Sequence, residues 1–333
     1  MRDLVRSDMT SASPIVIAHR GASGYLPEHT LAAKALAHGM GAHFIEQDVV
    51  LSRDGVPIVT HDIYLDSTTD VALRFPDRAR PDGRFYAIDF DLREIRQLRV
   101  HERTHVDADG QGAAFFPERF PAQPALFTLP TLSEEIALLS GLDQSRGCRT
   151  GLYIELKSPN WHRREGLDLA SAVLKVLNET GYWNLPEQVF LQCFDDQTLR
   201  QLREELRAPL PMVQLIGENS WDEDSEVDYD YLRTTEGLSY IAGYAQGIGP
   251  HLPHIYLGKT ASGAARFSGL VDSAHACGLQ VHPYTFRRDE LPTGIDSFEE
   301  LMDIFFRQGG IDGVFTDFPD IVVNYLRNTR DAT

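Results

Sequence analysis

Short apolar runs recur along the chain, and polar or turn-forming residues separate them. Segments such as Ile15–His19 and Val189–Phe194 are rich in the β-branched and aromatic residues that favour strands. Strands alternating with helical patterns indicate βα units and a parallel sheet. The candidate strands are Ile15–His19, His43–Val49, Val56–His61, Leu152–Lys157, Val189–Phe194, Met212–Ile216, Gln246–Pro250, Leu279–Thr285 and Gly313–Asp317.

Helical patterns lie between many of these strands. Leu167–Asn178 has apolar residues at helical spacing and is followed by Gly181, a residue typical of helix ends. Together the segments favour an α/β fold of the TIM barrel type, which needs eight strands. The candidates exceed that number by one, and Gln246–Pro250 is the weakest of them. The other predicted helices are Leu31–His38, Gln197–Leu206, Arg266–Cys277 and Phe298–Arg307.

The chain after the third candidate strand departs from this alternation. The stretch is far longer than a βα loop, which usually has about two to six residues. Within it, Asp91 and Glu94 have the spacing of a capping box, and Thr131 and Glu134 repeat that spacing. We therefore expect an insertion over one end of the barrel, with a helical piece. The expected boundaries are 1–14 for an N-terminal extension, 15–330 for the barrel and 65–130 for the insertion.

Composition and charge exclude some functions. No apolar run reaches about 18 residues, so we expect no insertion into a membrane. The net charge of −18 disfavours nucleic acids and anionic membrane surfaces as partners. The negative net charge would repel a small anionic substrate. Binding one would therefore require basic side chains or a metal ion that make the electrostatic potential positive at the site. The sequence carries no signal for an oligomeric state.

Two features bear on the cellular compartment. The N-terminal stretch MRDLVRSDMTSASP has charges but no apolar core, so the chain as given carries no secretory signal. The three cysteines, Cys148, Cys193 and Cys277, lack metal-type spacing and do not suggest a disulfide framework. We expect a cytoplasmic location, with a periplasmic one as the alternative if a signal has been removed.

Carboxylates interrupt two of the apolar strands. Glu46 and Asp48 lie two positions apart and therefore on one face of their strand. Glu155 lies in the segment YIELK, near the end of another strand. Carboxylate oxygens suit Ca²⁺ or Mg²⁺, and a shared cation would remove the repulsion between buried carboxylates. These residues predict a site for one divalent cation, with pairing to Arg or Lys as the alternative.

Histidines and basic residues lie at neighbouring strand ends. His19 and His61 suit general acid–base catalysis near neutral pH. Arg20 and Lys157 would hold a phosphate, or pair with the same carboxylates. Sites of parallel barrels form at the carboxyl ends of strands, so we expect these residues to meet there. The histidines that we interpret as structural are His29, His38, His101, His105, His162, His251, His254 and His275.

The ordered motifs resemble one known family. IAHRGASGYLPEHTLAA, EQDVVLSRDGVPIVTHD, YIELK, HPYTFR and GVFTDFP are similar, in this order, to the glycerophosphodiester phosphodiesterase family. The similarity runs from about Ile15 to Tyr325, and the insertion resembles the periplasmic bacterial (GlpQ-type) branch. It implies a TIM barrel that hydrolyses glycerophosphodiesters, such as glycerophosphocholine and glycerophosphoethanolamine, to sn-glycerol 3-phosphate and an alcohol.

The resemblance also implies roles for individual residues. PEHT has His29 where many members have Asn, and this variant resembles the same branch. From their place at late strand ends, Tyr284 and Arg287 are candidates for the glycerol or head-group pocket, and Asp317 is either a polar site group or structural. By motif, the acid–base pair is His19 and His61, the residues near the phosphate are Arg20 and Lys157, and the metal ligands are Glu46, Asp48 and Glu155.

Other functions are compatible with parts of the sequence. A phospholipase C- or D-like barrel acting on intact lipids would need an exposed apolar rim, and the insertion is too polar to indicate one. A metal-dependent sugar-phosphate isomerase or aldolase could use the same fold, and a Schiff-base aldolase would depend on Lys157. A binding protein without activity is disfavoured because the acidic and histidine residues are all present.

Overall fold

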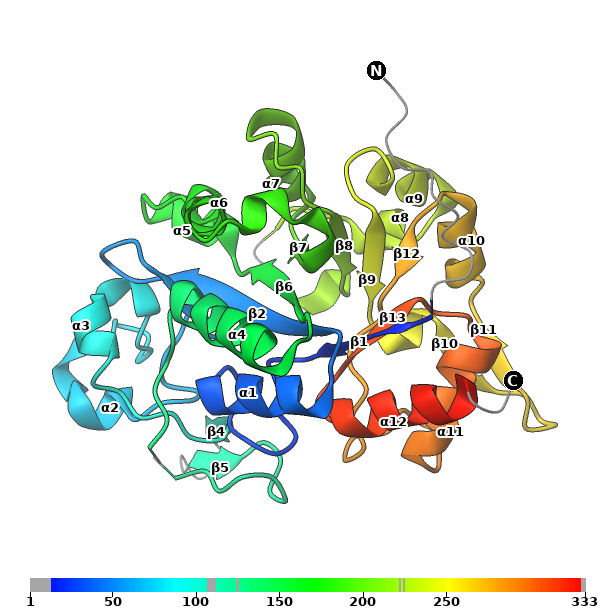
Figure 1. Ribbon diagram of the computed structural model, residues 1–333, viewed down its shortest axis with the longest axis horizontal. Coiled ribbons are helices and arrows are strands. Elements are labelled where there is room, and N and C mark those ends of the chain that lie inside the picture. Colours follow the sequence, from blue (N-terminus) through cyan, green and yellow to red (C-terminus); the bar gives the residue numbers. More distant parts are fainter. Residues whose placement is uncertain (1–12, 107–111, 124–125, 222, 224, 331–333) are drawn as a thin grey trace.

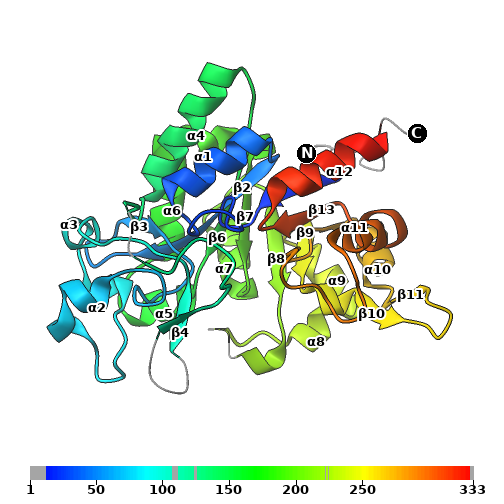
Figure 2. The same cartoon turned by 90° about the horizontal axis from the view of Figure 1, so that it is seen from below.

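Eight parallel strands form the centre of the protein, and helices surround them (Figures 1 and 2). The computed structural model describes residues 13–106, 112–123, 126–221, 223 and 225–330. Strands that follow one another around the barrel are paired, and the first pairs with the last; only the last two, β12 and β13, form no regular strand pair. The predicted TIM barrel is confirmed. Its strands are β1 (Ile15–Ala18), β2 (Phe44–Leu51), β6 (Gly151–Leu156), β7 (Val189–Cys193), β8 (Met212–Ile216), β9 (Gly247–Pro250), β12 (Gln280–Val281) and β13 (Gly313–Thr316).

The barrel closes between its last two strands through individual backbone hydrogen bonds. β12 has only two residues. Asp312 N donates to Val281 O at 3.1 Å, and Phe315 N donates to Pro283 O at 3.1 Å. Phe286 N returns a bond to Phe315 O at 2.8 Å. The chain after β12 therefore continues beside β13, where it carries the HPYTFR motif to the carboxyl end of the barrel.

The surplus candidate strand is the third one and not Gln246–Pro250, which contains the barrel strand β9. β3 (Pro57–Val59) runs antiparallel to β2, with Pro57 opposite Leu51. β2 has eight residues and is long enough to extend beyond its parallel neighbours. At Gly55, with φ of 74°, the chain turns back as a hairpin. Apolar alternation identifies a strand but not its direction, so the sequence pattern could not separate this hairpin from a barrel strand.

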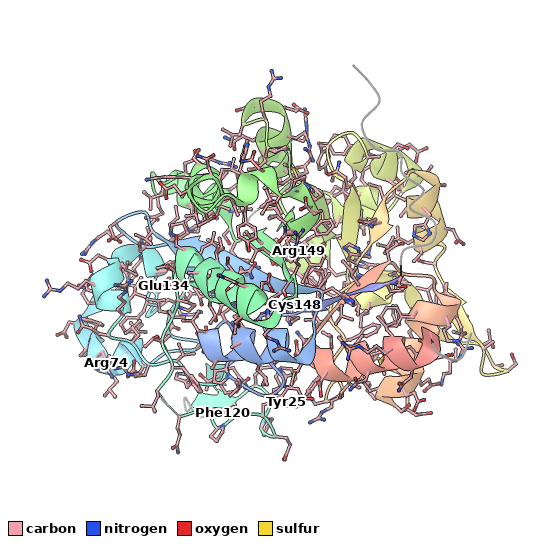
Figure 3. All side chains as sticks on the ribbon, in the orientation of Figure 1. Tyr25, Arg74, Phe120, Glu134, Cys148 and Arg149 are labelled. Atoms are coloured by element: carbon pink, nitrogen blue, oxygen red, sulfur yellow. The ribbon has the colours of Figure 1, made fainter. Side chains whose placement is uncertain are left out.

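Helices follow the strands, and all the predicted ones are present with shifted ends. α1 (Leu31–Met40) begins after Thr30, whose hydroxyl accepts a bond from Ala33 N at 3.1 Å. α4 (Leu132–Arg146) begins with the predicted capping box, in which Thr131 and Glu134 exchange hydrogen bonds. Glu134 lies at the start of this helix (Figure 3). The other helices beside the barrel are α5 (Pro159–Arg164), α6 (Leu169–Glu179), α7 (Asp196–Arg200), α8 (Tyr229–Leu232), α9 (Thr235–Ile241), α10 (Leu270–Ala276), α11 (Phe298–Met302) and α12 (Pro319–Arg330).

The insertion lies between β3 and α4 and has an apolar core of its own. Phe90 and Ile95 pack there with Val50 of β2, so this core continues from the β2–β3 hairpin. The predicted capping box of Asp91 and Glu94 is present. The expected domain boundaries stay a prediction, and most of the expected extension 1–14 lies outside the described residues. The insertion elements are α2 (Val71–Arg74), α3 (Leu92–Ile95), β4 (Thr104–Val106) and β5 (Gly112–Ala114); a further hairpin, β10 (Tyr256–Lys259) with β11 (Ala265–Phe267), follows β9.

Packed side chains fill the barrel interior. A small cluster of Ile17, Tyr153, Val213 and Phe315 lies there, separate from the larger core between strands and helices. Tyr153 donates from its hydroxyl to His282 Nδ1 at 2.9 Å. The interior is therefore a core, which leaves the carboxyl ends of the strands as the place for a site. Among the described residues, no helix combines the length and apolar character that crossing a membrane requires.

Candidate functional site

Three buried carboxylates meet at the carboxyl end of the barrel. Glu46, Asp48 and Glu155 each place one oxygen within 4.8 Å of the other two. The register of two paired strands produces this arrangement, because Asp48 of β2 lies directly opposite Glu155 of β6. Glu46 lies two residues before Asp48 and points to the same face. The structure thus brings the three predicted metal ligands together.

The electrostatics of this cluster fit a hard divalent cation. Burial, followed by the charges of Asp48 and Glu155, raises the pKa of Glu46 well above its usual value. Burial also raises the pKa of Glu155 to about 8, although Lys157 Nζ donates to its Oε1 at 2.8 Å. Asp48 Oδ1 is buried and has no hydrogen-bond partner in the described structure. An orphan carboxylate oxygen beside two like charges is what a calcium- or magnesium-type ion would stabilise.

A chain of polar contacts supports Asp48 from behind. His29 Nε2 donates to Asp48 Oδ2 at 2.8 Å, so this histidine holds a predicted ligand rather than only filling the core. Lys34 of α1 donates to His29 Nδ1 at 3.1 Å. The same ammonium lies 3.3 Å from Glu135 of α4 and also donates to the backbone oxygen of Glu46. Two helices therefore fix the orientation of the acidic cluster.

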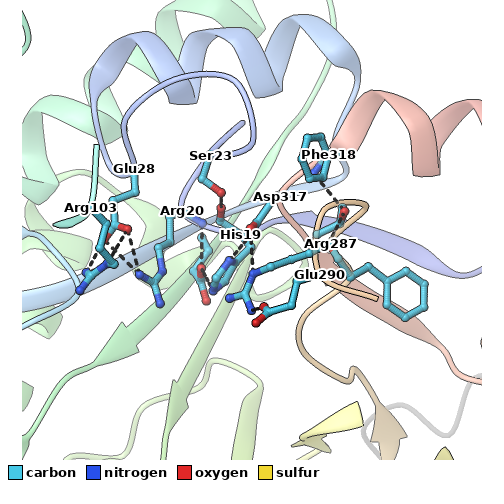
Figure 4. A network of polar contacts seen from close by, with 12 residues as sticks. His19, Arg20, Ser23, Glu28, Arg103, Arg287, Glu290, Asp317 and Phe318 are labelled. Atoms are coloured by element: carbon cyan, nitrogen blue, oxygen red, sulfur yellow. Dashed lines mark hydrogen bonds and ion pairs between the residues drawn. The ribbon is translucent and has the colours of Figure 1, made fainter. Parts of the chain in front are cut away.

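His19 reaches the site from the end of β1. Its Nδ1 donates to Asp317 Oδ1 at 2.5 Å, and its Nε2 lies 3.9 Å from Glu46 Oε2. Arg119 also donates to Asp317, at 2.7 Å. Arg287 donates to the same carboxylate at 2.9 Å (Figure 4). Burial lowers the pKa of His19 to about 4, against the opposing effect of the Asp317 charge. The ring is thus neutral near pH 7, with Nε2 directed to the acidic cluster.

His61 has the same kind of support. Its Nδ1 donates to Asp62 Oδ1 at 2.5 Å, and Arg103 of the insertion donates to Asp62 Oδ2 at 2.7 Å. Lys157 Nζ donates to His61 Nε2 at 3.4 Å. Burial, with the charges of Arg20 and Lys157, lowers the pKa of His61 to about 3. We expected His61 to end a parallel barrel strand, and this prediction is wrong. His61 follows the antiparallel strand β3, which brings the chain back to the carboxyl end of the barrel.

The HRG segment places Arg20 by its backbone geometry. Gly21 has φ of 90°, and a side-chain carbon there would lie 2.9 Å from the carbonyl carbon of Ala33, so only glycine fits. Arg20 itself has φ of 59°, and its backbone N–H donates to Glu46 Oε2 at 2.8 Å. Its guanidinium donates to Glu28 Oε1 at 3.0 Å. The contact with Glu28 supports the predicted salt-bridge role of Arg20. Arg20 also lines the site cavity, which is compatible with the predicted phosphate-binding role.

A cavity of about 400 Å³ opens over these residues. Tyr284 and Arg287 line it, as predicted for a substrate pocket. Tyr284 donates from its hydroxyl to the backbone oxygen of Ile216 at 2.9 Å, and Arg287 donates to Glu290 at 2.7 Å. The rest of the wall includes His19, Arg20, Glu46, His61, Glu155, Lys157, Gln192, Phe194, Trp221 and His251. Every predicted site residue except Asp48 thus lines one cavity, and Asp48 is buried.

Comparison with known proteins decides the family. The profile of the glycerophosphoryl diester phosphodiesterase family matches residues 19–321. The chain belongs to this family. A curated glycerophosphodiester phosphodiesterase of Haemophilus influenzae is 39% identical over 95% of this chain and 90% of its own length. The resemblance seen in the motifs is confirmed, and the protein is a glycerophosphodiester phosphodiesterase.

Solved structures of similar proteins agree with the barrel of this glycerophosphodiester phosphodiesterase. A crystal structure from Silicibacter pomeroyi is 25% identical, with a TM-score of 0.69, and covers 96% of this chain and 95% of that one. A phosphodiesterase of Oleispira antarctica, in complex with the product sn-glycerol-3-phosphate, is 25% identical with a TM-score of 0.62. It covers 95% of this chain and 97% of that one.

Proposed function

We propose that this phosphodiesterase uses one hard divalent cation, Ca²⁺ or Mg²⁺, and a pair of histidines to release sn-glycerol 3-phosphate from glycerophosphodiesters. The observation that carries the proposal is the placement of His19 and His61. Each imidazole is supported by an aspartate and borders the cavity that is also lined by Glu46 and Glu155 of the three-carboxylate cluster. The sn-glycerol-3-phosphate bound to the Oleispira antarctica relative supports the same product here.

Glu46, Asp48 and Glu155 would hold the cation. When bound, it would supply positive charge against the phosphodiester and against the charge that builds in the transition state. Arg20 and Lys157 line the same cavity and add positive charge there. This local charge offsets the repulsion that a protein with a net charge of −18 exerts on an anionic substrate.

The two imidazoles would move the protons. The tautomer with hydrogen on Nδ1 leaves Nε2 able to accept a proton. One ring accepts a proton from the attacking water, or from the adjacent glycerol hydroxyl if a cyclic phosphate forms first. The other ring, protonated when the anionic substrate is bound, donates its proton to the departing alcohol oxygen as the phosphorus–oxygen bond breaks. In hydrolysis, water supplies one hydrogen to the alcohol and its oxygen to the phosphate.

Asp317 and Asp62 would act as positioning residues. Their carboxylates orient the rings and stabilise each imidazolium when it forms, which favours proton transfer. Asp317 is held ionised by Arg287 and His19, and Asp62 by Arg103, because these groups lower both pKa values well below the usual range despite burial. Neither aspartate needs to accept the proton itself.

Removal of the cation gives the direct test. We expect EDTA to abolish release of sn-glycerol 3-phosphate from glycerophosphocholine and glycerophosphoethanolamine, and added Ca²⁺ or Mg²⁺ to restore it. The Glu155→Gln variant should need a higher cation concentration for half-maximal rate, because a ligand charge is lost. Intact phosphatidylcholine belongs in the substrate panel as the lipid alternative. Full activity in EDTA after dialysis would contradict the metal site.

A further inference from the structure

Two histidines and a glutamate come together at the edge of the catalytic cavity, apart from the acidic cluster. Glu218, His251 and His254 each place one side-chain ligand atom within 4.8 Å of the other two. His254 Nε2 lies 2.8 Å from Glu218 Oε1. From the sequence both histidines are interpreted as structural, and only the folded chain places them beside each other and beside a carboxylate.

The ends of two adjacent barrel strands produce this histidine–glutamate cluster. Glu218 lies two residues after β8, and His251 directly follows β9. The two strands pair in parallel, and His251 N donates to Ile216 O at 3.3 Å, so the chain segments leave the barrel side by side. In the turn that follows, His254 N donates to His251 O at 2.9 Å. The turn brings the two imidazole rings of HLPH to 5.8 Å between their centres.

Both rings carry a buried nitrogen that nothing in the described part of the chain contacts by a hydrogen bond. These atoms are Nδ1 of His251 and Nδ1 of His254, and His254 is only 6% exposed. Arg233 Nη1 lies 3.7 Å from Oε2 of Glu218, which leaves Oε1 facing the histidine. Buried polar atoms usually have a partner, so two such nitrogens beside a carboxylate indicate a ligand that the chain itself does not supply.

The donor atoms of this cluster differ from those of the acidic cluster. Three carboxylates suit Ca²⁺ or Mg²⁺, whereas two imidazoles with one carboxylate suit Zn²⁺ and similar transition-metal ions. Ligand atoms around a tetrahedral zinc lie roughly 3.3 Å apart, because each bond is about 2.0–2.1 Å long. The spacing here is 2.8 Å for one pair of atoms and at most 4.8 Å for the others. Small side-chain rotations would therefore bring all three ligands onto one ion.

We propose that Glu218, His251 and His254 bind a transition-metal ion of the zinc type, at a site separate from the acidic cluster. Each histidine ligates as the neutral ring, with its single hydrogen on the nitrogen that does not bind the ion. Water completes the coordination shell. His251 lines the cavity of about 400 Å³ together with Trp221, whose ring centre lies 5.0 Å away, and with Tyr284. The ion therefore lies at the border of the space that holds the substrate.

Zinc titration of the full-length enzyme tests the site. The protein is treated with EDTA, dialysed and titrated with Zn²⁺ by isothermal titration calorimetry in excess Ca²⁺, which competes for the acidic cluster. We expect one zinc ion per chain with a Kd of about 1 μM or below. His251→Gln and His254→Gln should each weaken zinc binding by more than about a hundredfold, because even the loss of an outer-shell partner costs about 10- to 100-fold.

Two control variants show where the zinc binds. Glu155→Gln removes a carboxylate of the acidic cluster and should leave the zinc affinity unchanged. Cys148→Ser should also leave it unchanged; this residue belongs to the remaining group of metal-type side chains among the described residues, which contains His38, Asp143 and Cys148. Co²⁺ gives a second readout, because a four-coordinate site with imidazole ligands absorbs visible light more strongly than an octahedral site of oxygens. This absorption should be lost in both histidine variants and kept in both controls.

The outcomes decide the proposal without reference to hydrolysis. Absence of zinc binding by the wild type, or wild-type affinity in either histidine variant, would overturn the site. Loss of binding in Glu155→Gln or Cys148→Ser would assign the zinc to another cluster and overturn it equally. If circular dichroism shows that His254→Gln fails to fold, the partly exposed His251→Gln decides alone. Release of sn-glycerol 3-phosphate tests the proposed function separately, so either result can fail while the other stands.

Discussion

At the scale of single residues, the two cavity-facing imidazoles carry the proposed chemistry. We expect His19→Ala and His61→Ala each to lower kcat by about 10²–10⁴ with the fold intact, because each removes one proton-transfer group. Steady-state release of sn-glycerol 3-phosphate, with circular dichroism as a check of folding, measures this. His275→Ala, at a half-exposed histidine paired with Asp312, is the matched control and should leave kcat unchanged. Near-normal kcat in both His19→Ala and His61→Ala would contradict the proposal that these histidines transfer the protons.

Asp62 tests whether the aspartates act through the rings. An asparagine there keeps the size but removes the charge that stabilises the imidazolium of His61, and we expect kcat to fall by about tenfold to a hundredfold with little change in KM. A purely structural role would leave the pH profile in place. We therefore also expect the pH profile of kcat to shift in Asp62→Asn, and an unshifted profile would show that the contact serves only packing.

The residues that line the site could be predicted from the sequence, whereas the residues that contact and orient them could not. Glu46, Asp48 and Glu155 could be found because carboxylates in apolar strands are conspicuous. Arg103 could not, since it lies in the irregular insertion, and its contact with Asp62 spans 41 residues of chain whose path no pattern specifies. His29 was interpreted as structural because a single histidine has no distinguishing pattern; only its 2.8 Å contact with Asp48 reveals its role.

At the scale of elements, the periodic segments were predicted well and the direction of one strand was not. The capping boxes of α3 and α4 could be read from the sequence because capping depends on neighbours three residues apart. The direction of β3 depends instead on how far β2 extends beyond the barrel. A turn at Gly55 is compatible with a hairpin, but it equally fits a short loop before a parallel strand. The hairpin matters for function because it returns His61 to the acidic cluster.

The contact between α1 and α4 gives a prediction for these elements. Lys34 and Glu135 are fully buried, and burial raises the pKa of Glu135 to about 7 against the opposing charge of Lys34. We expect Lys34→Met to lower the free energy of unfolding by about 3–5 kcal/mol, because it leaves a buried acid without its partner. Urea denaturation measures the change.

A double variant separates the ion pair from simple loss of packing. Lys34→Met with Glu135→Leu replaces both charges by apolar groups and should be more stable than Lys34→Met alone, since no buried charge is left without a partner. If the double variant is the less stable of the two, the buried pair is not what links the helices, and the bonds from Lys34 to His29 and to the Glu46 backbone account for the loss.

At the scale of the whole molecule, barrel and insertion together form the site. The barrel supplies the acidic cluster and His19, whereas the insertion supplies Arg103 and Arg119, which hold the two aspartates behind the histidines. The sequence predicted an insertion over one end of the barrel, and the resemblance extended to it. The cavity between the barrel and the insertion, which His19 and Arg103 both line, could not be predicted, because it depends on how the insertion packs against the barrel rather than on any local pattern.

Buried histidines make the stability of the whole chain depend on pH. Burial lowers the pKa of His282 to about 4 from an ordinary value of 6.5, and the opposing charge of Asp312 has a smaller effect. Between pH 6.5 and 4 the unfolded chain therefore binds a proton at this residue that the folded chain does not. Unfolding is favoured as the pH falls through this range, by at most about 3 kcal/mol from this histidine.

Urea denaturation between pH 7 and pH 4 measures this dependence. His282→Gln removes the titrating ring but keeps an acceptor for the Tyr153 hydroxyl, so the decline in the free energy of unfolding should be shallower than in the wild type. His105→Gln, at an exposed histidine, should reproduce the wild-type slope. Part of the decline should persist in His282→Gln, because burial also lowers the pKa values of His19 and His29. Equal slopes for His282→Gln and the wild type would mean that the His282 ring is protonated in the folded protein, which its apolar surroundings inside the barrel oppose.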